Sequence, residues 1–375
     1  MRLLMGLMIA GPVASCSLRQ AAVLRSRAGL LSASMSAGAM TPPPQRVALV
    51  TGASRGIGKG IAVALGRAGF IVYAVGRSSR ESSEETGLDL TIEATAEKIT
   101  SVGGTGHALR CDISKDEAIN EAIAQVSDAE GRLDLLCCSA YTVPSGPLKA
   151  PFWEQGVEMW DAVNSVGLRS VYLTCCAAAQ LMISTAAKKD QASPPLMVLV
   201  SSFGGKAYTF NVAYGVGKAA VDRLAADMSQ ELGALGVATC ALYPGVVKTE
   251  NNLALEAAGK WKEASGGLDL SQGETPDFSG KGVAALASLT SEEIFRRSGS
   301  VQVVAELARE FGFTEEDGRQ PPSIRSTSFL LPNYAFPEME KQGMQIPQWV
   351  KDNVPDVLLP WSIFSAGPAP KREGD

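Results

Sequence analysis

Histidine is almost absent from this sequence, since His107 is the only one among 375 residues. A hydrolase with a Ser-His-Asp triad, or a zinc site with several imidazole ligands, would have to be built around that single side chain. The composition therefore argues against two large classes of enzyme. It also raises the question of which side chain moves protons near pH 7, where histidine is the usual choice.

The chain also lacks a basic block, a long apolar run and a regular cysteine framework. Its formal net charge is -5 and its arginines are scattered, so we expect no nucleic-acid partner. No run of eighteen apolar residues occurs, so we expect no transmembrane span in the mature domain. The seven cysteines form no CxxC motif, and we interpret them as small buried apolar side chains. They are Cys16, Cys111, Cys137, Cys138, Cys175, Cys176 and Cys240.

Acidic residues are missing from the first 45 positions, and the first one in the chain is Glu81. The same stretch contains Arg2, Arg19, Arg25 and Arg27. An arginine-rich, acid-poor leader is typical of a transit peptide, whereas the apolar LLMGLMIAGPVAS that follows Arg2 also fits a short secretory signal. We predict a targeting segment at 1–45 for a mitochondrion or plastid, or alternatively for the secretory pathway. A disordered tail without an address is the third possibility.

From Arg46 onward, short apolar runs alternate with helix-length segments. The runs of strand length are 46–51, 70–76, 106–110, 133–138, 196–201 and 237–243, with a further one starting near Gly299. The helix-length segments are 58–68, 88–102, 115–130, 159–185 and 211–235. Nearly continuous apolar strands are typical of a parallel sheet covered on both faces. The alternation predicts one α/β domain at 46–325, a Rossmann-like doubly wound parallel sheet with helices on both faces.

Prolines are frequent near the C-terminus, and we predict an irregular Pro-rich tail at 326–375. Three aromatic residues in this tail, Trp349, Trp361 and Phe364, should pack on the domain rather than enter a bilayer.

Three glycines, Gly52, Gly56 and Gly58, lie between the first predicted strand and the first predicted helix. Glycine permits a tight turn and a close approach of the backbone, so a pyrophosphate could bind to the N–H groups that begin the helix. This TGxxxGxG pattern could also serve packing alone, but its position between a strand and a helix favours a dinucleotide site.

Charge after the second predicted strand indicates which dinucleotide would bind. A ribose with free hydroxyls favours a carboxylate there, but the sequence supplies Gly76 and Arg77. Arg55 lies in the glycine loop as well. Two guanidinium groups suit a 2′-phosphate and favour NADP(H) over NAD(H), unless both are surface arginines without a ligand.

Tyr214 and Lys218 lie four positions apart and would share one face of a helix. A free tyrosine has a pKa of about 10, and a lysine and an oxidised nicotinamide nearby would lower it. Tyrosine could then replace histidine as acid and base. The YxxxK motif is common by chance, but Ser201 and Ser202 end a strand upstream of it. Asn164 lies inside a predicted helix, where an amide is unfavourable.

Together with Asp112 in CDIS and with PGVVKT at 244–249, these motifs resemble the short-chain dehydrogenase/reductase family, from residue 46 to about 325. The resemblance implies that Tyr214 is the general acid in reduction and that Lys218 binds the ribose and lowers the tyrosine pKa. It implies that Ser202 orients the substrate carbonyl and that Asn164 holds a water in a proton relay. It further implies a cofactor site. The residues of that site are Gly52, Ser54, Arg55, Gly56, Ile57, Gly58, Arg77, Asp112, Tyr214, Lys218, Pro244, Gly245, Val247 and Thr249.

Three departures from the family pattern stand out. CCSAY at 137–141 replaces the usual NNAG, which removes two amides and adds the bulky Tyr141 near the cofactor. Gly217 stands where a serine usually precedes the lysine. The interval from Ser202 to Tyr214 is one residue shorter than usual, and strand alignment favours Ser202 over Ser201 as the functional serine.

We therefore predict an NADP(H)-dependent oxidoreductase that reduces a ketone or aldehyde to an alcohol, or runs the reverse reaction, by hydride transfer. Its partner would be a small carbonyl or alcohol substrate, no metal is expected, and the family is compatible with a homo-oligomer. The alternatives are a non-catalytic NADP-binding redox sensor and an enoyl-thioester reductase on the same scaffold. The segment 250–280 is rich in Ala and Gly and does not identify the substrate.

Overall fold

The computed structural model describes residues 44–82, 90–143, 150–188 and 193–365. All of these residues belong to one compact unit that begins at Pro44. The predicted targeting segment at 1–45 and Cys16 lie outside the described residues, apart from the last two positions of the segment.

Seven parallel strands form a single sheet in the described residues, in the order β3-β2-β1-β4-β5-β6-β7. The strands are β1 Val47–Thr51, β2 Ile71–Gly76, β3 Thr105–Arg110, β4 Leu135–Cys138, β5 Leu196–Val200, β6 Ala238–Tyr243 and β7 Val301–Val303. This confirms the predicted doubly wound sheet. The strand order reverses between β1 and β4, and in such sheets ligands bind beyond the carboxyl ends of the strands at this reversal.

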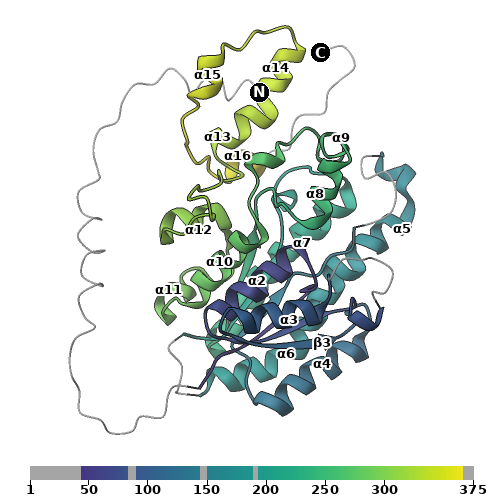
Figure 1. Ribbon diagram of the computed structural model, residues 1–375, viewed down its shortest axis with the longest axis vertical. Helices are drawn as coiled ribbons and strands as arrows, with labels where there is room; N and C mark the ends of the chain where they lie inside the picture. The colour runs from purple at the N-terminus through teal and green to yellow at the C-terminus, as the bar shows by residue number, and fades with distance from the viewer. Residues whose placement is uncertain (1–43, 83–89, 144–149, 189–192, 366–375) are drawn as a thin grey trace, which may run out of the picture. The chain divides into compact units, whose positions relative to one another are not determined.

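Helices cover both faces of the sheet (Figure 1). One layer contains α2 Gly56–Arg67, α3 Ile92–Ser101, α10 Pro276–Ala287 and α12 Val304–Phe311. The other contains α4 Asp116–Glu130, α6 Ser170–Ala186 and α7 Val212–Leu232. Successive strand residues alternate between the layers, since Ala48 and Val50 of β1 belong to the first core and Val47 and Leu49 to the second. Both strand faces are buried, which explains the continuous apolar runs.

Local sequence explains where several of these helices begin and end. Thr91 caps α3 by accepting a hydrogen bond from the N–H of Ala94 at 3.2 Å. Thr275 caps α10, and Pro276 follows at the first helical position, where a missing N–H costs nothing. Gly131 ends α4 in a left-handed conformation at φ 61°.

The helix α5, Phe152–Asn164, continues through a π-helical turn, η3 Ser165–Arg169, into α6. By length and composition alone, the joined helix Phe152–Ala186 is a candidate membrane span among the described residues. Val171, Cys175 and Met182 on its inner face are buried against the sheet. A core helix of a folded domain meets the same criteria of length and composition. The packing of this helix against the sheet therefore explains its apolar residues.

After Arg325, the chain is more regular than the sequence predicts. It forms α13 Thr327–Leu330, a π-helical turn η7 Leu331–Ala335, α14 Phe336–Lys341, α15 Gln348–Asp352 and α16 Ser362–Ser365. Pro332 and Pro337 lie in the first turns of η7 and α14, where proline is compatible with a helix. Proline here therefore starts short helices instead of preventing them.

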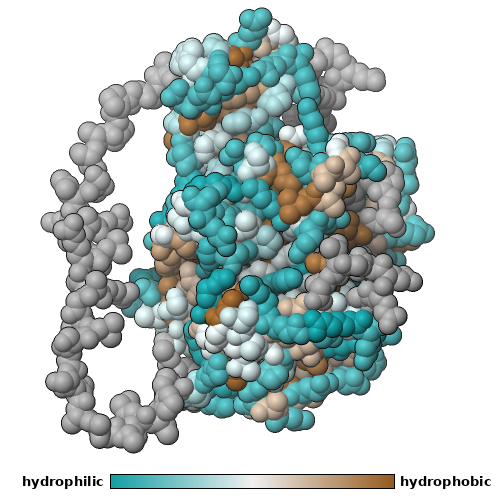
Figure 2. Space-filling view, viewed as in Figure 1, coloured by the Kyte–Doolittle hydropathy of each residue, from teal (hydrophilic) through white to brown (hydrophobic). Residues whose placement is uncertain are grey.

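The aromatic residues of this tail do not all behave as predicted. Trp361 and Phe364 pack on the ring of Phe203, with centroids 6.5 Å and 5.0 Å away. Trp349 is 70% exposed, so its predicted packing on the domain is wrong. Elsewhere the surface on view is mainly hydrophilic, with an apolar patch in the region of α8 Glu250–Ala257 and α9 Trp261–Ser265 (Figure 2).

Candidate active site

The predicted glycine loop connects β1 to α2 and leaves no space for side chains. Gly52 has a φ of 69°, and a Cβ atom there would lie 2.6 Å from the Cα of Ala140, beyond β4. A Cβ atom on Gly58 would lie 2.3 Å from the carbonyl oxygen of Gly52. The loop therefore turns tightly into the N-terminus of α2, whose first N–H groups have no partner within the helix, as an anion site requires.

Glu250, the first residue of α8, reaches this helix N-terminus. Its Oε2 atom accepts a hydrogen bond of 2.8 Å from the N–H of Gly56. Anionic oxygens are favoured at such a position by the free N–H groups and the helix dipole. The sequence did not mark Glu250, because nothing local relates residues 194 positions apart.

The two predicted arginines lie on neighbouring loops, Arg55 in the glycine loop directly before α2 and Arg77 directly after β2. Arg55 and Arg77 are exposed, and Nη2 of Arg55 donates to Oγ of Ser78 at 3.2 Å. Asp112 accepts hydrogen bonds from the N–H and hydroxyl of Ser114 at 3.1 Å and 2.8 Å. Burial opposes ionisation of Asp112, but these bonds and the charge of Arg77 outweigh it and lower the carboxyl pKa.

Tyr214 lies in the first turn of α7, beside Ser202, the second residue after β5. Asn211 caps this helix, and its Oδ1 atom accepts from the N–H of Tyr214 at 2.9 Å. Burial raises the pKa of the Tyr214 phenol, and a hydrogen bond with Ser202 works against this rise. Among the protein groups, burial outweighs the hydrogen bond that favours the phenolate. The predicted lowering of the tyrosine pKa by Lys218 together with an oxidised nicotinamide stays a prediction.

Lys218 lies one helical turn further along α7 and is buried. Burial lowers the pKa of its ammonium group to about 8, and the charge of Asp222 acts in the opposite direction. Its Nζ atom donates to the carbonyl oxygen of Val200 at 3.1 Å and lies 5.2 Å from the ring centre of Tyr141 and 5.9 Å from that of Tyr214. The lysine thus stands beside the phenol without an ion pair to it.

The two neighbouring serines have different surroundings. Ser202 contacts Tyr214, as described above, while the buried Ser201 donates from Oγ to the carbonyl oxygen of Lys218 at 3.1 Å. The choice of Ser202 as the serine that faces the tyrosine therefore agrees with the geometry.

Asn164 ends α5 at the π-helical turn, where the widened helix accommodates an amide. Its Nδ2 atom donates to the carbonyl oxygen of Ala213 at 3.3 Å. Its Oδ1 atom is buried and has no hydrogen-bond partner among the described residues. A buried acceptor without a hydrogen bond destabilises the folded protein unless a donor such as a water molecule binds to it.

One cavity of about 270 Å³ joins several predicted residues at the carboxyl ends of the strands. Its wall contains Ser202, Tyr214 and Lys218 together with Ile57, Pro244, Gly245, Val247 and Thr249. Asn164 lies on the other side of Tyr141 and Lys218, in a smaller space that these residues share with Tyr214. The main cavity is not lined by the other predicted cofactor residues Arg55, Arg77, Asp112 and the three loop glycines. A long ligand such as a dinucleotide could still reach them by extending out of the cavity.

Residues 46–259 match the family described as short chain dehydrogenase. The chain belongs to this family. It is similar to dehydrogenase/reductase SDR family member 1 of Mus musculus, with 38% identity over 330 residues that cover 83% of this chain and 97% of the mouse protein. The shared length extends well beyond the family match and into the C-terminal region.

Solved structures of the family give a similar fold. A metagenomic short-chain oxidoreductase in complex with NADP is 26% identical, with a TM-score of 0.52, and the match covers 69% of this chain and 95% of that one. The 3-oxoacyl-[acyl-carrier protein] reductase of Brucella melitensis in complex with NAD is 23% identical, with a TM-score of 0.59 over 70% of this chain and 96% of that one. The first of these two structures contains NADP and the second contains NAD.

The departures from the family pattern now have structural reasons. A Cβ atom at position 217 would lie 2.1 Å from Oδ1 of Asn164, so Gly217 makes space for that amide. In CCSAY, the N–H groups of Ser139 and Ala140 donate to Oγ1 of Thr51 at 3.2 Å and 3.3 Å. Thr51 thereby joins β1 to β4 where the family usually has amide side chains.

Tyr141 of the same segment forms part of the site. Its ring meets that of Tyr214 edge-on at 5.9 Å, and burial raises the pKa of its phenol. Phe210 approaches Tyr214 from another side at 5.2 Å and holds a φ of 61°, which is unusual for a bulky residue. Such strain persists where the surroundings require it, as at functional sites.

Sequence reasoning also missed Glu274, which lies below the PGVVKT loop and is fully buried. Its carboxylate accepts from the N–H of Gly245 at 3.0 Å and from the hydroxyl of Ser279 at 2.6 Å. Burial raises the pKa of Glu274 to about 7, although these two bonds favour its charged form. Glu274 thus connects the loop after β6 to α10.

Proposed function

We propose that this protein is an NADP(H)-dependent carbonyl reductase that converts a ketone or aldehyde into an alcohol, or runs the reverse reaction. The main support is the convergence of Ser202, Tyr214 and Lys218 on one cavity at the carboxyl ends of the strands. Membership of the short-chain dehydrogenase family supports the oxidoreductase class.

The residues present fit a dinucleotide. The carboxylate of Glu250 already accepts a hydrogen bond from Gly56, so this helix N-terminus has the chemistry to bind a phosphate oxygen. Arg55 and Arg77 would bind the 2′-phosphate of NADP(H), and Asp112 would lie near the adenine. Lys218 would hold the nicotinamide ribose, and Val247 and Thr249 would lie near the carboxamide. When bound, NADPH supplies the hydride that reduces the carbonyl carbon.

Tyr214 would give its phenolic proton to the carbonyl oxygen, so that the substrate gains one hydride and one proton and becomes an alcohol. Ser202, which already hydrogen-bonds with this phenol, would hold the carbonyl oxygen beside it. Lys218 is mostly protonated at pH 7 and would favour the phenolate that remains. The unpartnered Oδ1 atom of Asn164 suits a water that returns a proton to this set.

The test is steady-state consumption of NADPH and NADH with a panel of ketones and aldehydes and with crotonyl-CoA. We expect turnover of a carbonyl compound with NADPH preferred, and a loss of about 10²-fold or more in Tyr214→Phe at unchanged NADPH affinity. Tyr172→Phe, an exposed tyrosine of α6, is the matched control and should behave as the wild type. Wild-type turnover by Tyr214→Phe would refute the mechanism.

Two other results would favour the alternatives. Turnover of crotonyl-CoA without that of any ketone would indicate an enoyl-thioester reductase. NADPH binding without turnover of any compound would favour a redox sensor.

A further inference from the structure

The residues 324–364, here called the C-terminal segment, contribute to the cavity that contains Tyr214. Ile324, Phe329 and Tyr334 line it together with Ser202 and Tyr214. Ile324 and Phe329 are buried, while Tyr334 is 48% exposed at the surface. These residues lie beyond 46–259, the part of the chain that matches the family, so they do not belong to the shared cofactor-binding core.

The cavity wall is apolar and almost free of charge. Besides the residues of the C-terminal segment, the wall contains Phe203, Phe210, Trp261 and Leu268. Lys218 is the only charged side chain among the described residues that line it, and its ammonium group is bonded to the carbonyl of Val200. A carboxylate or phosphate on the substrate would lose its hydration here without gaining a partner, which costs several kcal/mol.

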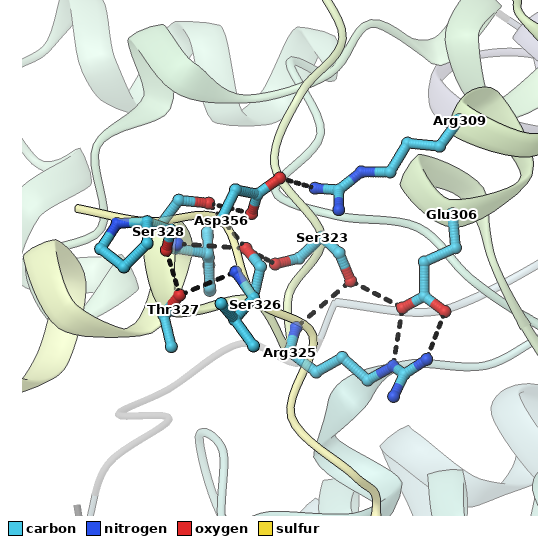
Figure 3. Close-up of polar contacts among 11 residues, drawn as sticks. Glu306, Arg309, Ser323, Arg325, Ser326, Thr327, Ser328 and Asp356 are labelled. Atoms are coloured by element: carbon cyan, nitrogen blue, oxygen red, sulfur yellow. Dashed lines mark hydrogen bonds and ion pairs between the residues drawn. The ribbon is translucent and has the colours of Figure 1, made fainter. Parts of the chain in front are cut away.

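A partly buried ion pair joins the C-terminal segment to the sheet domain (Figure 3). Arg325 donates to both carboxylate oxygens of Glu306 on α12, at 2.7 Å and 2.6 Å. The hydroxyl of Ser323 donates to the same carboxylate at 2.8 Å, and Nη1 of Arg325 donates to the carbonyl oxygen of Leu359 at 2.7 Å. Because the guanidinium of Arg325 binds both carboxylate oxygens of Glu306, this bidentate pair fixes the position and the direction of the chain next to Ile324.

A second set of bonds folds the segment back on itself. The N–H of Thr327 donates to the carbonyl oxygen of Val357 at 2.9 Å, and that of Leu359 donates to the carbonyl oxygen of Arg325 at 3.0 Å. Asp356 accepts from Ser328 at 2.5 Å and pairs with Arg309 of α12 at 2.5 Å (Figure 3). The turn that carries Phe329 is therefore anchored at both ends.

Aromatic packing connects the C-terminal segment to the residues beside Ser202 and Tyr214. Trp361 lies 5.8 Å from the ring of Tyr243 and 6.5 Å from that of Phe203, and the guanidinium of Arg325 lies over Trp361 at 5.2 Å. Phe203 directly follows Ser202 and lines the cavity. The segment thus packs on the residue next to the serine that faces Tyr214.

We infer that the C-terminal segment is the substrate-selecting wall of this enzyme, and that the site takes an uncharged carbonyl compound whose apolar body lies against Phe329 and Tyr334. The inference rests on the proposed carbonyl reduction, which places the carbonyl group at Ser202 and Tyr214. A carbonyl compound with a carboxylate or phosphate on that body is disfavoured, because Lys218 is the one cation among the described residues of the wall and it is already bonded to the carbonyl oxygen of Val200.

The test compares two ketones that differ only in charge, 4-methylacetophenone and 4-acetylbenzoate, and a small ketone, 2-butanone. We expect kcat/KM of the wild type to be at least about tenfold higher for 4-methylacetophenone than for 4-acetylbenzoate. Tyr334→Ala should lower kcat/KM about tenfold for 4-methylacetophenone and less than about twofold for 2-butanone. Trp349→Ala, an exposed aromatic residue of the same segment that does not line the cavity, is the matched control and should change neither value.

Tyr334 is chosen because its exposure makes the variant compatible with folding, which the melting temperature verifies. Equal kcat/KM for the two acetophenones, or an unchanged preference in Tyr334→Ala, would overturn the inference. If the wild type reduced no ketone, the proposed function would fail, and saturation-transfer NMR with the NADP⁺-loaded protein would still decide the inference. Binding of 4-methylacetophenone that weakens in Tyr334→Ala would support it, and equal binding of both acetophenones would overturn it.

Discussion

The cofactor region (residues 46–112) and the C-terminal segment meet the same cavity but are built in different ways. In the cofactor region, backbone packs on backbone, as between Gly52 and the chain at Ala140. The C-terminal segment is held instead by side chains, with the pair Arg325–Glu306 and the ring of Trp361 as its main attachments. The first region therefore has no space for an added Cβ atom at Gly52 or Gly58, whereas the second can exchange its attachments without disturbing the sheet.

This difference suits the two tasks. NAD and NADP share the pyrophosphate and the rings, so one fixed backbone cradle suits both dinucleotides. Substrates vary, and a wall made of side chains on a separate segment can vary with them. The comparison makes a clear prediction: substitutions in the first region should affect cofactor binding, and those in the second should affect stability or substrate choice alone.

The largest effect is expected for Gly58→Ala. The added Cβ atom would meet the carbonyl oxygen of Gly52 at 2.3 Å, so the glycine loop must shift. We expect NADPH affinity to fall about 100-fold, which corresponds to about 3 kcal/mol. Isothermal titration calorimetry with NADPH measures it.

Gly233→Ala is the control, because the residue is helical and no atom lies within 4 Å of the added Cβ. It should leave affinity unchanged and stability equal or slightly higher. If Gly58→Ala bound NADPH with wild-type affinity, the glycine loop would tolerate the added Cβ atom, and this would contradict the proposed difference between the two regions.

The next effect concerns the other side of the comparison. Arg325→Gln removes one partner of a pair whose side chains are 18% and 22% exposed, which leaves Glu306 without its cation. We expect a loss of about 2 kcal/mol in the free energy of unfolding, with unchanged NADPH affinity. Chemical denaturation and NADPH titration of the same samples measure the two quantities.

Arg296→Gln breaks an exposed pair with Glu292, 67% and 82% exposed, and should cost almost nothing. A large fall in NADPH affinity in Arg325→Gln would contradict the separation of the two regions.

The sequence predicted the cofactor region better than the C-terminal segment, for a physical reason. The glycine loop, the strand before it and the YxxxK motif are local patterns, so their spacing alone indicates their geometry. The wall of the cavity depends on contacts between distant residues, such as Arg325 with Leu359 or Glu274 with Gly245, which leave no periodic trace in the sequence. From the sequence, Gly217 is a departure from the usual serine without a reason. The structure supplies the reason, because Oδ1 of Asn164 occupies the space of a side chain at position 217.

An intermediate effect is expected for Glu274, which ties the cofactor-facing loop to α10. Because burial raises its pKa to about 7, from an ordinary value near 4.5, the folded protein holds this proton over a pH range in which the unfolded chain has lost it. Its contribution to stability is therefore present at low pH and is lost as pH rises through about 7. Between pH 5.5 and 8.5 the loss should be about 2 kcal/mol.

Glu274→Gln should remove that part of the pH dependence, as measured by denaturation at several pH values. Glu256→Gln on the exposed side of α8 is the control and should keep the wild-type slope. Glu315 lies close to Glu274 and is present in all three proteins, so the comparison isolates Glu274. Identical slopes for the wild type and Glu274→Gln would refute the assignment.

The smallest expected effect sharpens the comparison within the cofactor region itself. Glu250 occupies the N–H of Gly56 at 2.8 Å, where a pyrophosphate oxygen would bind, so the carboxylate has to leave when NADPH arrives. Removing its charge in Glu250→Gln should therefore tighten NADPH binding, by about fivefold or about 1 kcal/mol. The gain should shrink at high salt, since screening weakens the repulsion that is removed. NADPH titrations at two salt concentrations measure both effects, with Glu256→Gln again as the control, and unchanged or weaker binding in Glu250→Gln would mean that the carboxylate does not compete with the phosphates.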